Sequence, residues 1–340
     1  MIIYIKGNGW NIKMERCSLL GIRLSDIISF NNSVYAAGVD ILKVKDSKVI
    51  WIRELTINYE GTRDNPKPVY YSVNLYVLDM ESDGKYIYLN AGPIIKTDDN
   101  LNIIWAVWAG RDIYDIAVSD GIYCVERNKI LKLDKNGEAE WAVALKSDEK
   151  IKLEIPEEKR RVAEIEGKEV PKFVVVERYS VNIFTSYATE DCVYIAGIVE
   201  HFREPKAYPF IAKLSASGNI LWIKILNSTY PGCDKDGCFI NIAGKILKYN
   251  EKTFIAWIDK VLLIFDENGD IIDYYEVNGI ISDIGIIGDK ILLTSVEPER
   301  VKIEKKEVRY IQIDIKAVKR SIKIKHIDKD KIKVVEHYSI

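Results

Sequence analysis

Histidine, cysteine and glutamine are scarce in this sequence. Of its 340 residues only three are histidines (His201, His326 and His337), five are cysteines, and Gln312 is the single glutamine. The histidines are scattered, no HExxH motif or CxxC pair occurs, and no nucleophile with a neighbouring base can be picked out. We therefore expect no cofactor and favour a protein without catalytic activity, with an enzyme left open as the alternative.

Long apolar runs and a surplus of one charge are also missing. No stretch approaches the ~18 apolar residues of a membrane helix, and the opening MIIYIKGNGWNIKMER lacks the features of a signal peptide. The 49 basic and 51 acidic side chains nearly cancel, whereas nucleic-acid binders usually carry a basic surplus. We expect a cytoplasmic protein that does not bind nucleic acid and does not insert into a membrane.

The abundant residue types indicate a folded, stable chain. Apolar side chains make up 48% of the residues, which is enough for a sizeable core. The scarcity of glutamine beside many charged residues is typical of a hyperthermophile and gives an archaeal-like composition.

The five cysteines are interpreted against this composition. Cys17, Cys124 and Cys192 lie in apolar, strand-like segments and are predicted to be buried thiols. Cys233 and Cys238 bracket a short loop, and disulfides do occur inside hyperthermophile cells. A local Cys233–Cys238 disulfide is one prediction, and two free thiols or a metal site are the alternatives.

A repeated unit that contains a tryptophan organises the chain. Its clearest copy, ILKLDKNGEAEWAVAL at Ile130–Leu145, predicts a strand, a tight turn at Asp134–Gly137 and a second strand opened by Trp141. Further copies lie at Ile41–Leu55, Ile94–Trp108 and Ile211–Leu226, and a fifth at Leu262–Val277 has Asp273 where the tryptophan would be. Repetition at this period indicates a radial or solenoidal β-architecture.

Two more predicted strands precede each unit, and the second carries phrases such as VYAAG at Val34–Gly38 and YIAG at Tyr194–Gly197. Four strands per unit are typical of a β-propeller blade. Blades are predicted at about 25–55, 71–109, 113–145, 173–226, 239–277 and 282–326, with Ile2–Lys6, Trp10–Cys17 and Lys331–His337 left over. We predict one all-β domain over 1–340, a seven-bladed β-propeller of four-stranded antiparallel blades closed by these N- and C-terminal strands; six blades are the alternative.

The first strand of each predicted blade begins with an acid or an amide that an aliphatic residue follows. These positions are Asp26, Asn74, Asp115, Asn182, Asn241 and Asp283. In a propeller they would lie near the mouth of the central channel, where Asp26, Asp115 and Asp283 would bind a cation or polar ligand. The more ordinary interpretation is that they cap strand ends and bond one blade to the next.

The long insertions are predicted to lie on one face of the disc. Antiparallel strand order puts these segments on the same face: Thr56–Tyr70, Lys146–Lys172, Glu200–Pro209, Asn227–Cys238 and Glu297–Glu307. Long loops on a rigid scaffold are often functional, and Tyr and Arg are enriched at interfaces. We predict a partner-binding face made of Tyr59, Arg63, Tyr70, His201, Phe202, Arg203, Tyr208 and Tyr230. The alternative is that the aromatic side chains only pack the loops onto the disc.

The longest insertion, at about 146–172, carries many charges of both signs. Its later half, VAEIEGKEVPKFVVVE, alternates around Gly167 and predicts a β-hairpin that projects from the disc. It would be either a docking arm for a protein or a solvated hairpin.

The unit of a strand, an Asp-x-x-Gly turn and a tryptophan-initiated strand resembles the tryptophan-docking repeat of quinoprotein-like (PQQ-repeat) β-propellers. The match runs from Leu133 to Trp141 and from Leu214 to Trp222, with looser copies ending at Trp51 and Trp105. The resemblance implies that Trp51, Trp105, Trp141 and Trp222 are structural and pack against the neighbouring blade. That family includes quinone-dependent dehydrogenases and non-enzymatic scaffolds. Because the vicinal cysteine pair and calcium-binding acid cluster of the enzymes are missing here, the resemblance implies the fold and no cofactor.

These observations together predict a non-enzymatic protein-interaction scaffold that binds a protein through its loop-rich face. The alternative is a ligand- or metal-binding propeller enzyme that acts at the mouth of the central channel.

Overall fold

The computed structural model describes residues 3–7, 10–14, 24–61, 69–110, 112–234, 237–238, 243–279, 281, 283–287, 290–294 and 301–339. Three residues with predicted roles, Cys17, Arg63 and Asn241, lie outside these ranges. β-Strands dominate the described part of the chain, as the alternating apolar pattern predicted.

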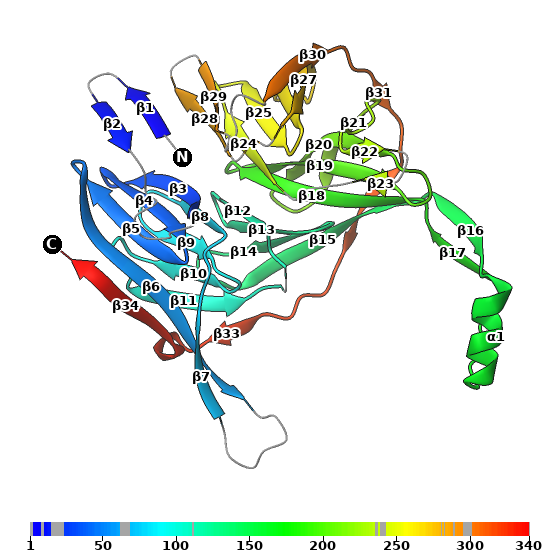
Figure 1. Ribbon diagram of the computed structural model, residues 1–340, viewed down its shortest axis with the longest axis horizontal. Coiled ribbons are helices and arrows are strands. Elements are labelled where there is room, and N and C mark those ends of the chain that lie inside the picture. The colour runs from blue at the N-terminus through cyan, green and yellow to red at the C-terminus, as the bar shows by residue number, and fades with distance from the viewer. Residues whose placement is uncertain are drawn as a thin grey trace.

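Five antiparallel sheets are arranged around a common centre, and each has four consecutive strands (Figure 1). The first contains β3 (Leu24–Phe30), β4 (Ser33–Gly38), β5 (Asp40–Lys45) and β6 (Lys48–Gly61). The second contains β8 (Asp79–Ser82), β9 (Ile87–Asn90), β10 (Ile94–Thr97) and β11 (Ile103–Trp108). The third contains β12 (Asp115–Val118), β13 (Ile122–Glu126), β14 (Lys129–Leu133) and β15 (Ala139–Ser147). The fourth contains β18 (Tyr179–Ala188), β19 (Cys192–His201), β20 (Ala207–Ser215) and β21 (Ile220–Leu226). The fifth contains β24 (Gly244–Lys248), β25 (Thr253–Ile258), β26 (Val261–Asp266) and β27 (Ile271–Asn278). This is the arrangement of propeller blades.

Four shorter pairings accompany these sheets. They are β1 (Ile3–Gly7) with β2 (Trp10–Met14), β7 (Val69–Asn74) with β6, β22 (Cys233–Asp234) with β23 (Gly237–Cys238), and β28 (Asp283–Ile287) with β29 (Lys290–Thr294). The prediction that Asn74 begins the inner strand of the second blade is wrong, because Asn74 pairs with Thr56 in a ribbon that extends β6. The inner strand begins instead at Asp79, and the alternating pattern alone does not distinguish a ribbon from a blade.

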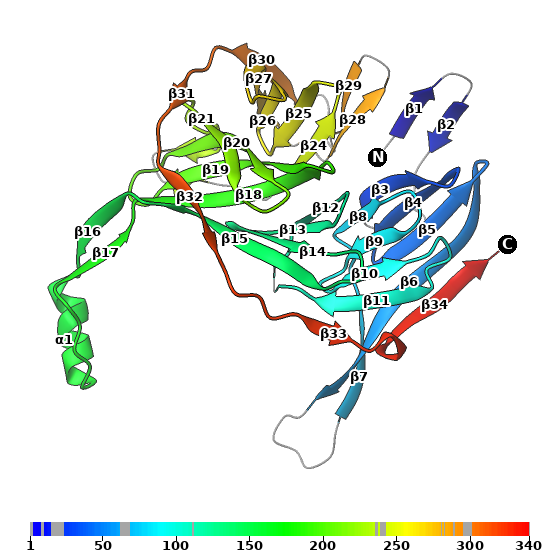
Figure 2. The same cartoon turned by 180° about the vertical axis from the view of Figure 1, so that it is seen from behind.

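The C-terminal belt, residues 302–339, runs around the outside of the ring and visits the five sheets in reverse order (Figure 2). Its strands β30 (Lys302–Lys306), β31 (Tyr310–Ile311), β32 (Ile315–Lys319), β33 (Lys325–Ile327) and β34 (Ile332–Ser339) pair with β27, β21, β15, β11 and β6, and a 3-10 helix η3 (Lys329–Lys331) precedes β34. The predicted blade at 282–326, and the use of Lys331–His337 to complete a closing blade, are therefore wrong. A strand's pattern shows which of its faces is buried and does not show which edge it joins.

A row of three side chains crosses the second, third and fourth strands of four sheets. The rows are Tyr35–Lys43–Trp51, Tyr88–Lys96–Trp105, Tyr123–Lys132–Trp141 and Tyr194–Lys213–Trp222. In the first row the Tyr35 and Trp51 ring centroids are 6.0 Å apart, and Lys43 Nζ lies 5.4 Å from the Tyr35 centroid. Aromatic and cation–π contacts of this kind stabilise the register of each sheet.

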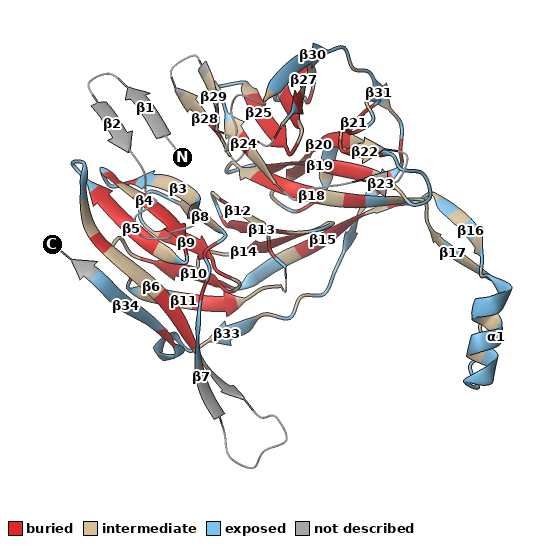
Figure 3. Ribbon diagram, in the orientation of Figure 1, coloured by how far each residue is buried: buried red, intermediate tan, exposed pale blue. Residues whose placement is uncertain are grey.

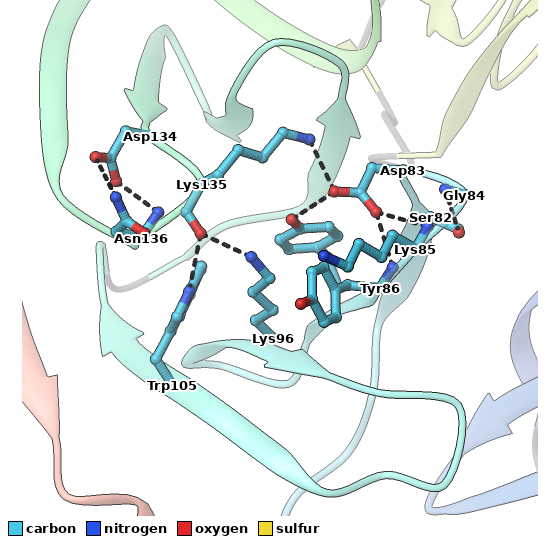
Figure 4. Close-up of polar contacts among 11 residues, drawn as sticks. Ser82, Asp83, Gly84, Lys85, Tyr86, Lys96, Trp105, Asp134, Lys135 and Asn136 are labelled. Carbon is cyan, nitrogen blue, oxygen red and sulfur yellow. Dashed lines mark hydrogen bonds and ion pairs between the residues drawn. The ribbon is translucent and has the colours of Figure 1, made fainter.

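In three of the four rows the tryptophan (Trp105, Trp141 or Trp222) also contacts the next sheet. The Trp105 indole N–H donates to the Lys135 carbonyl at 3.1 Å, and Lys96 Nζ donates to the same oxygen at 2.9 Å (Figure 4). In the following sheet the Trp141 indole N–H donates to the Ala216 carbonyl at 2.7 Å. The rings of Trp105, Trp141 and Trp222 each cover a turn glycine, and a Cβ on Gly137 would lie 3.2 Å from the Trp105 ring. These tryptophans therefore hold neighbouring sheets together.

The apolar core lies mainly between neighbouring sheets, and the belt contributes to it. Ile313 and Ile315 of the belt are buried among side chains of the third and fourth sheets, and Ile332 is buried against the first and second. Most other belt residues are exposed, as are those of the projecting helix (Figure 3).

An arm leaves the ring between the third and fourth sheets (Figure 1). It consists of the antiparallel strands β16 (Lys150–Glu154) and β17 (Phe173–Glu177) and the helix α1 (Glu157–Ile165). The predicted hairpin turn at Gly167 is wrong, because the segment before it is helical. Its Glu157–Arg161 ion pair has the i,i+4 spacing that favours a helix, and Val162 and Ile165 fit that period equally well.

Candidate functional site

A cavity of about 480 Å³ lies at the centre of the ring. The innermost strands β3, β8, β12, β18 and β24 line it, together with Asp283 of β28. Its ionisable carboxyl and amino side chains are Asp26, Asp79, Glu81, Asp115, Asp283 and Lys245. We call this space the central cavity.

Three of these carboxylates connect one sheet to the next. The bonds run from Met80 N to Asp26 Oδ2, from Ile116 N to Asp79 Oδ2 and from Ser186 N to Asp115 Oδ2, at 2.9, 2.6 and 2.7 Å. The Ser186 hydroxyl also donates to Asp115 Oδ2 at 2.5 Å. A short acidic side chain suits this task because a carboxylate accepts several hydrogen bonds from a neighbouring strand end. The blade-to-blade role considered from the sequence applies to Asp26 and Asp115.

The fourth and fifth sheets interrupt this series of acids. The β18 residue that precedes Ser186 is Thr185, whose hydroxyl lies 3.3 Å from Asp115 Oδ1. On β24 a cation takes over, because Lys245 Nζ lies 3.5 Å from Asp26 Oδ1 and 3.4 Å from Asp283 Oδ1. Lys245 of the fifth sheet therefore contacts both β28 and the first sheet.

Burial changes the protonation of this cluster. It raises the pKa of Glu81 to about 8, with the charges of Asp26 and Asp115 adding to the effect. Burial also raises the pKa of Asp115 to about 7, although hydrogen bonds from Ser186 oppose it, and it raises the pKa of Asp79. Near neutral pH the cavity thus retains protons on carboxyl groups and is less negative than its composition suggests.

The chemistry of the central cavity is that of oxygen donors. Its lining contains no histidine or cysteine among the described residues, and no hydroxyl–imidazole or thiol–imidazole pair. Carboxylate and hydroxyl oxygens suit a hard cation or a polar, cationic ligand. A bound cation would have to displace the protons that burial retains.

The structure brings together the three acids predicted at the channel mouth, Asp26, Asp115 and Asp283. Asn182 is not among the lining residues, and its side chain instead lies 3.4 Å from Glu200. Sequence analysis missed Asp79, although Asp79-Met80 repeats the acid–aliphatic phrase of the other inner strands. It also missed Glu81 and Lys245, for which no repeated signal exists.

The predicted partner-binding residues separate into different environments. Phe202 is 55% exposed and Arg203 is exposed, both at the tip of the β19–β20 hairpin. Tyr208 is half-buried on β20, while the His201 side chain is only 8% exposed. His201 Nδ1 accepts a hydrogen bond from Glu204 N at 2.9 Å, so this histidine shapes the hairpin tip.

The prediction that Tyr230 lies on the binding face is wrong. Tyr230 is fully buried, and its hydroxyl donates to the Asp259 carboxylate. It was assigned to the face because it lies in the long insertion Asn227–Cys238 and tyrosine is enriched at interfaces, and only the tertiary fold shows that its ring is buried in the core. The side chains of Tyr59, Arg63 and Tyr70 lie outside the described residues.

The cysteines have two different environments. A disulfide joins Cys233 to Cys238, which face each other across the β22–β23 pair. Cys124 and Cys192 are free and buried, and burial raises the pKa of the Cys124 thiol. A buried thiol of raised pKa is unreactive.

Comparison with known proteins gives a similarity of fold. The sequence matches no protein-family model, and no curated protein matches it significantly. Among solved structures, BamB from Moraxella catarrhalis is similar over 87% of each chain, with 11% identity and a TM-score of 0.41. The Pan2 WD40 domain of Neurospora crassa is similar over 85% of this chain and 90% of its own, with 9% identity and a TM-score of 0.37. The WD40 β-propeller domain of Doa1 is similar over 85% of this chain and 86% of that chain, with 7% identity and a TM-score of 0.33. At this level the resemblance to PQQ-like and WD40 propellers concerns architecture alone.

Within the described residues, no helix has the length and apolar character needed to cross a lipid bilayer.

Proposed function

We propose that the protein is a protein-interaction scaffold whose arm, residues 150–177, carries its principal docking element. The observation that supports this most strongly is that α1 has no buried residue. An isolated helix of fewer than about 12 residues is marginally stable in water, so a helix of this length is expected to gain its stability from something packed against it. Within the described chain nothing packs on it closely enough to bury a residue.

The arm exposes apolar side chains that its own fold does not use. Val162 is 57% and Ile165 87% exposed, and their i,i+3 spacing puts them on one side of α1. On β17, Val175 is 66% exposed. Ion pairs such as Glu157–Arg161 flank the helical pair. Two apolar anchors bordered by both charge signs suit an apolar groove on another protein, in the helix-in-groove mode.

The exposed part of the predicted binding face lies at the foot of this arm. Phe202 N donates to the Arg178 carbonyl at 2.9 Å, and Arg178 N donates to the Glu149 carbonyl at 2.8 Å. The exposed Phe202 ring therefore lies near the point where the arm leaves the ring. It would extend the contact surface from the arm to the disc.

We expect the double variant V162D/I165D to lose the partner that the wild-type protein captures from lysate, because two charges would enter an apolar contact. The affinity of the purified partner for the wild type and for the variant would then be measured by calorimetry. We expect the variant to bind the partner at least 100-fold more weakly. The control is Ile272→Asp, which alters an equally exposed apolar residue (55%) on β27. Unchanged affinity in V162D/I165D would contradict the proposed docking element.

A second variant removes the tip of the arm, residues 156–171, and keeps the strands β16 and β17. Ile155 N donates to the Lys172 carbonyl at 2.9 Å, so an Asn-Gly turn in place of residues 156–171 would join paired positions. Light scattering on this variant and the wild type distinguishes a different protein from a second copy of this chain. A wild-type dimer that becomes a monomer would identify self-association and contradict a heterologous partner.

A second candidate function, binding of a hard cation in the central cavity, is supported by the five carboxyl side chains that line it. Since folded Glu81 and Asp115 hold protons that unfolded carboxyl groups release near pH 4, their contribution to stability is present at low pH. It is lost progressively as pH rises from the unfolded pKa values near 4 to the folded pKa values of about 7 to 8, and the loss levels off above them. We expect the melting temperature to fall from about pH 5 to pH 8 and the fall to be smaller in Glu81→Gln.

A bound cation would oppose the fall of the melting temperature with pH, because it binds the deprotonated carboxylates in place of protons. We expect 5 mM calcium to raise the melting temperature at pH 8.5 more than at pH 6, measured by differential scanning fluorimetry. Equal shifts in wild type and Glu81→Gln would indicate that calcium acts elsewhere, and no shift at either pH would exclude this candidate.

We also infer that the ring has six positions. Residues of six inner strands line the central cavity, and β1 lies against β28, where the β1–β2 pair would complete a blade with β28 and β29. This corresponds to the six-bladed alternative, with N-terminal strands in the closing blade. A crystal structure with a seventh inner strand would contradict it.

A further inference from the structure

Three potential metal ligands converge at the outer edge of the first sheet, far along the chain from one another. Asp40 lies on β5, Glu54 on β6 and His337 on the belt strand β34. One ligand atom from each lies within 4.8 Å of the other two. This cluster is separate from the central cavity and from the arm.

The backbone explains how the three side chains meet. Asp40 and Glu54 are direct cross-strand partners, so their carboxylates lie on the same face of the sheet. The β34–β6 register shifts between Glu336 and Tyr338, which makes His337 the extra residue of a β-bulge. Bulges re-aim a side chain, and here His337 Nε2 lies 3.1 Å from Glu54 Oε2 and 3.8 Å from Asp40 Oδ1.

The two carboxylates, of Asp40 and Glu54, have no cationic lysine or arginine partner in the part of the chain that the structure describes. Nearby on the same two strands, Arg53 pairs with Glu336 at 2.8 Å. Two carboxylates directly opposite each other repel, and one imidazole, even when protonated, does not offset two negative charges. A divalent cation would offset both charges.

The donor set indicates the class of cation. Neutral imidazole with two carboxylates suits first-row transition ions such as Zn²⁺, whereas Mg²⁺ and Ca²⁺ take oxygen ligands. Ligand bonds of about 2.0–2.2 Å in a tetrahedral site place ligand atoms roughly 3.3 Å apart. His337 Nε2 lies 3.1 and 3.8 Å from its two carboxylates, close to that value. With His337 46% and Glu54 15% exposed, water has access for a fourth position.

We propose that Asp40, Glu54 and His337 form a binding site for a divalent transition metal, and that the bound ion clips the end of the C-terminal belt to the first sheet. One ion would connect three adjacent strands at the place where the belt ends. The site goes beyond the docking function of the arm, and neither proposal depends on the other.

The test is calorimetric titration of the full-length protein with Zn²⁺ at pH 7.5, after treatment with chelator. We expect one equivalent to bind, and the affinity to fall at least tenfold in His337→Ala and in Glu54→Gln. The matched control is His326→Ala, which removes an exposed histidine that contacts a single carboxylate, Glu138 at 3.0 Å. Circular dichroism on every variant excludes loss of fold as the cause.

Hydrogen exchange gives a readout that a loosely bound surface ion would not change. We expect Zn²⁺ to slow amide exchange in peptides that cover β34 in the wild type and not in His337→Ala. The proposal is overturned if no zinc binds at 1 mM, or if His337→Ala and His326→Ala bind it with the same affinity as the wild type. Zinc binding lost in Glu81→Gln would instead assign the ion to the central cavity and would also overturn the clip.

Discussion

A chain that ends at residue 301 is expected to accumulate as insoluble protein, whereas the full-length chain folds. The truncation removes the fifth strand from all five sheets. It also removes Ile313, Ile315 and Ile332, which are 6%, 8% and 5% exposed. Each buried isoleucine contributes about 1.5–3 kcal/mol, so their loss approaches the 5–15 kcal/mol of net stability of a typical domain.

Exposed sheet edges add to this effect. Without the belt, the outer strands β6, β11, β15, β21 and β27 present unpaired N–H and C=O groups, and such edges pair with other chains. The belt therefore protects the edges of the sheets and also completes their cores.

The expectation is measured by comparing soluble yield and denaturant midpoint for chains that end at 301, at 328 and at 340. The chain that ends at 328 loses only η3 and β34, and its midpoint should be intermediate. Point variants separate packing from edge exposure: Ile332→Ala should cost about 2–4 kcal/mol, and Val335→Ala, at 40% exposure, less than about 1. A soluble, fully stable chain ending at 301 would show that the belt is dispensable.

The substitution Gly269→Ala is expected to destabilise the protein by about 2–4 kcal/mol, the second of the large effects. Gly269 has a φ of +81°, and an added Cβ would lie 2.7 Å from the Trp222 ring. Because Trp222 belongs to the fourth sheet and Gly269 to a turn of the fifth, relief of the clash would require the two sheets to separate.

Gly84→Ala is the matched control for the backbone. Gly84 has a φ of +82°, and nothing lies within 4 Å of its Cβ position. A left-handed conformation costs alanine about 1 kcal/mol, and that cost is common to both variants. The difference in unfolding free energy between them thus reports the tryptophan contact.

A double-mutant cycle completes this test. In a Trp222→Ala background, Gly269→Ala should cost only the backbone contribution of about 1 kcal/mol, because the ring it would strike is absent. Denaturant unfolding followed by circular dichroism supplies the four values. Equal costs for Gly269→Ala and Gly84→Ala in the wild-type background would mean that the ring does not constrain the turn.

The repeating part of this fold was determined by the sequence alone. The recurrence of a tryptophan after four of the tight turns, and of a tyrosine two strands earlier, predicted radial β-sheets. In the structure Tyr123, Lys132 and Trp141 occupy adjacent strands of one sheet. Such rows are local, so a pattern with a period of two residues and a turn signal is sufficient to predict them.

Acids at inner-strand starts could also be predicted in part. Asp26, Asp115 and Asp283 follow the same phrase, and the ring brings them to one cavity. Lys245 has no counterpart in the repeat, and its place between Asp26 and Asp283 depends on how distant strands converge. The raised pKa of Glu81 likewise arises from burial, which is a property of the assembled ring.

Only the tertiary structure decided which edge each C-terminal strand joins. The alternation in residues such as Ile315–Lys319 indicates a strand. The same alternation is expected for the inner strand of a further blade and for an additional outer strand on a blade that earlier residues form. The choice depends on free sheet edges and on core spaces that distant segments create, including those filled by Ile313 and Ile332. The meeting of His337 with Asp40 and Glu54 follows from that same choice, because a contact between the two ends of a chain is not encoded in any local pattern.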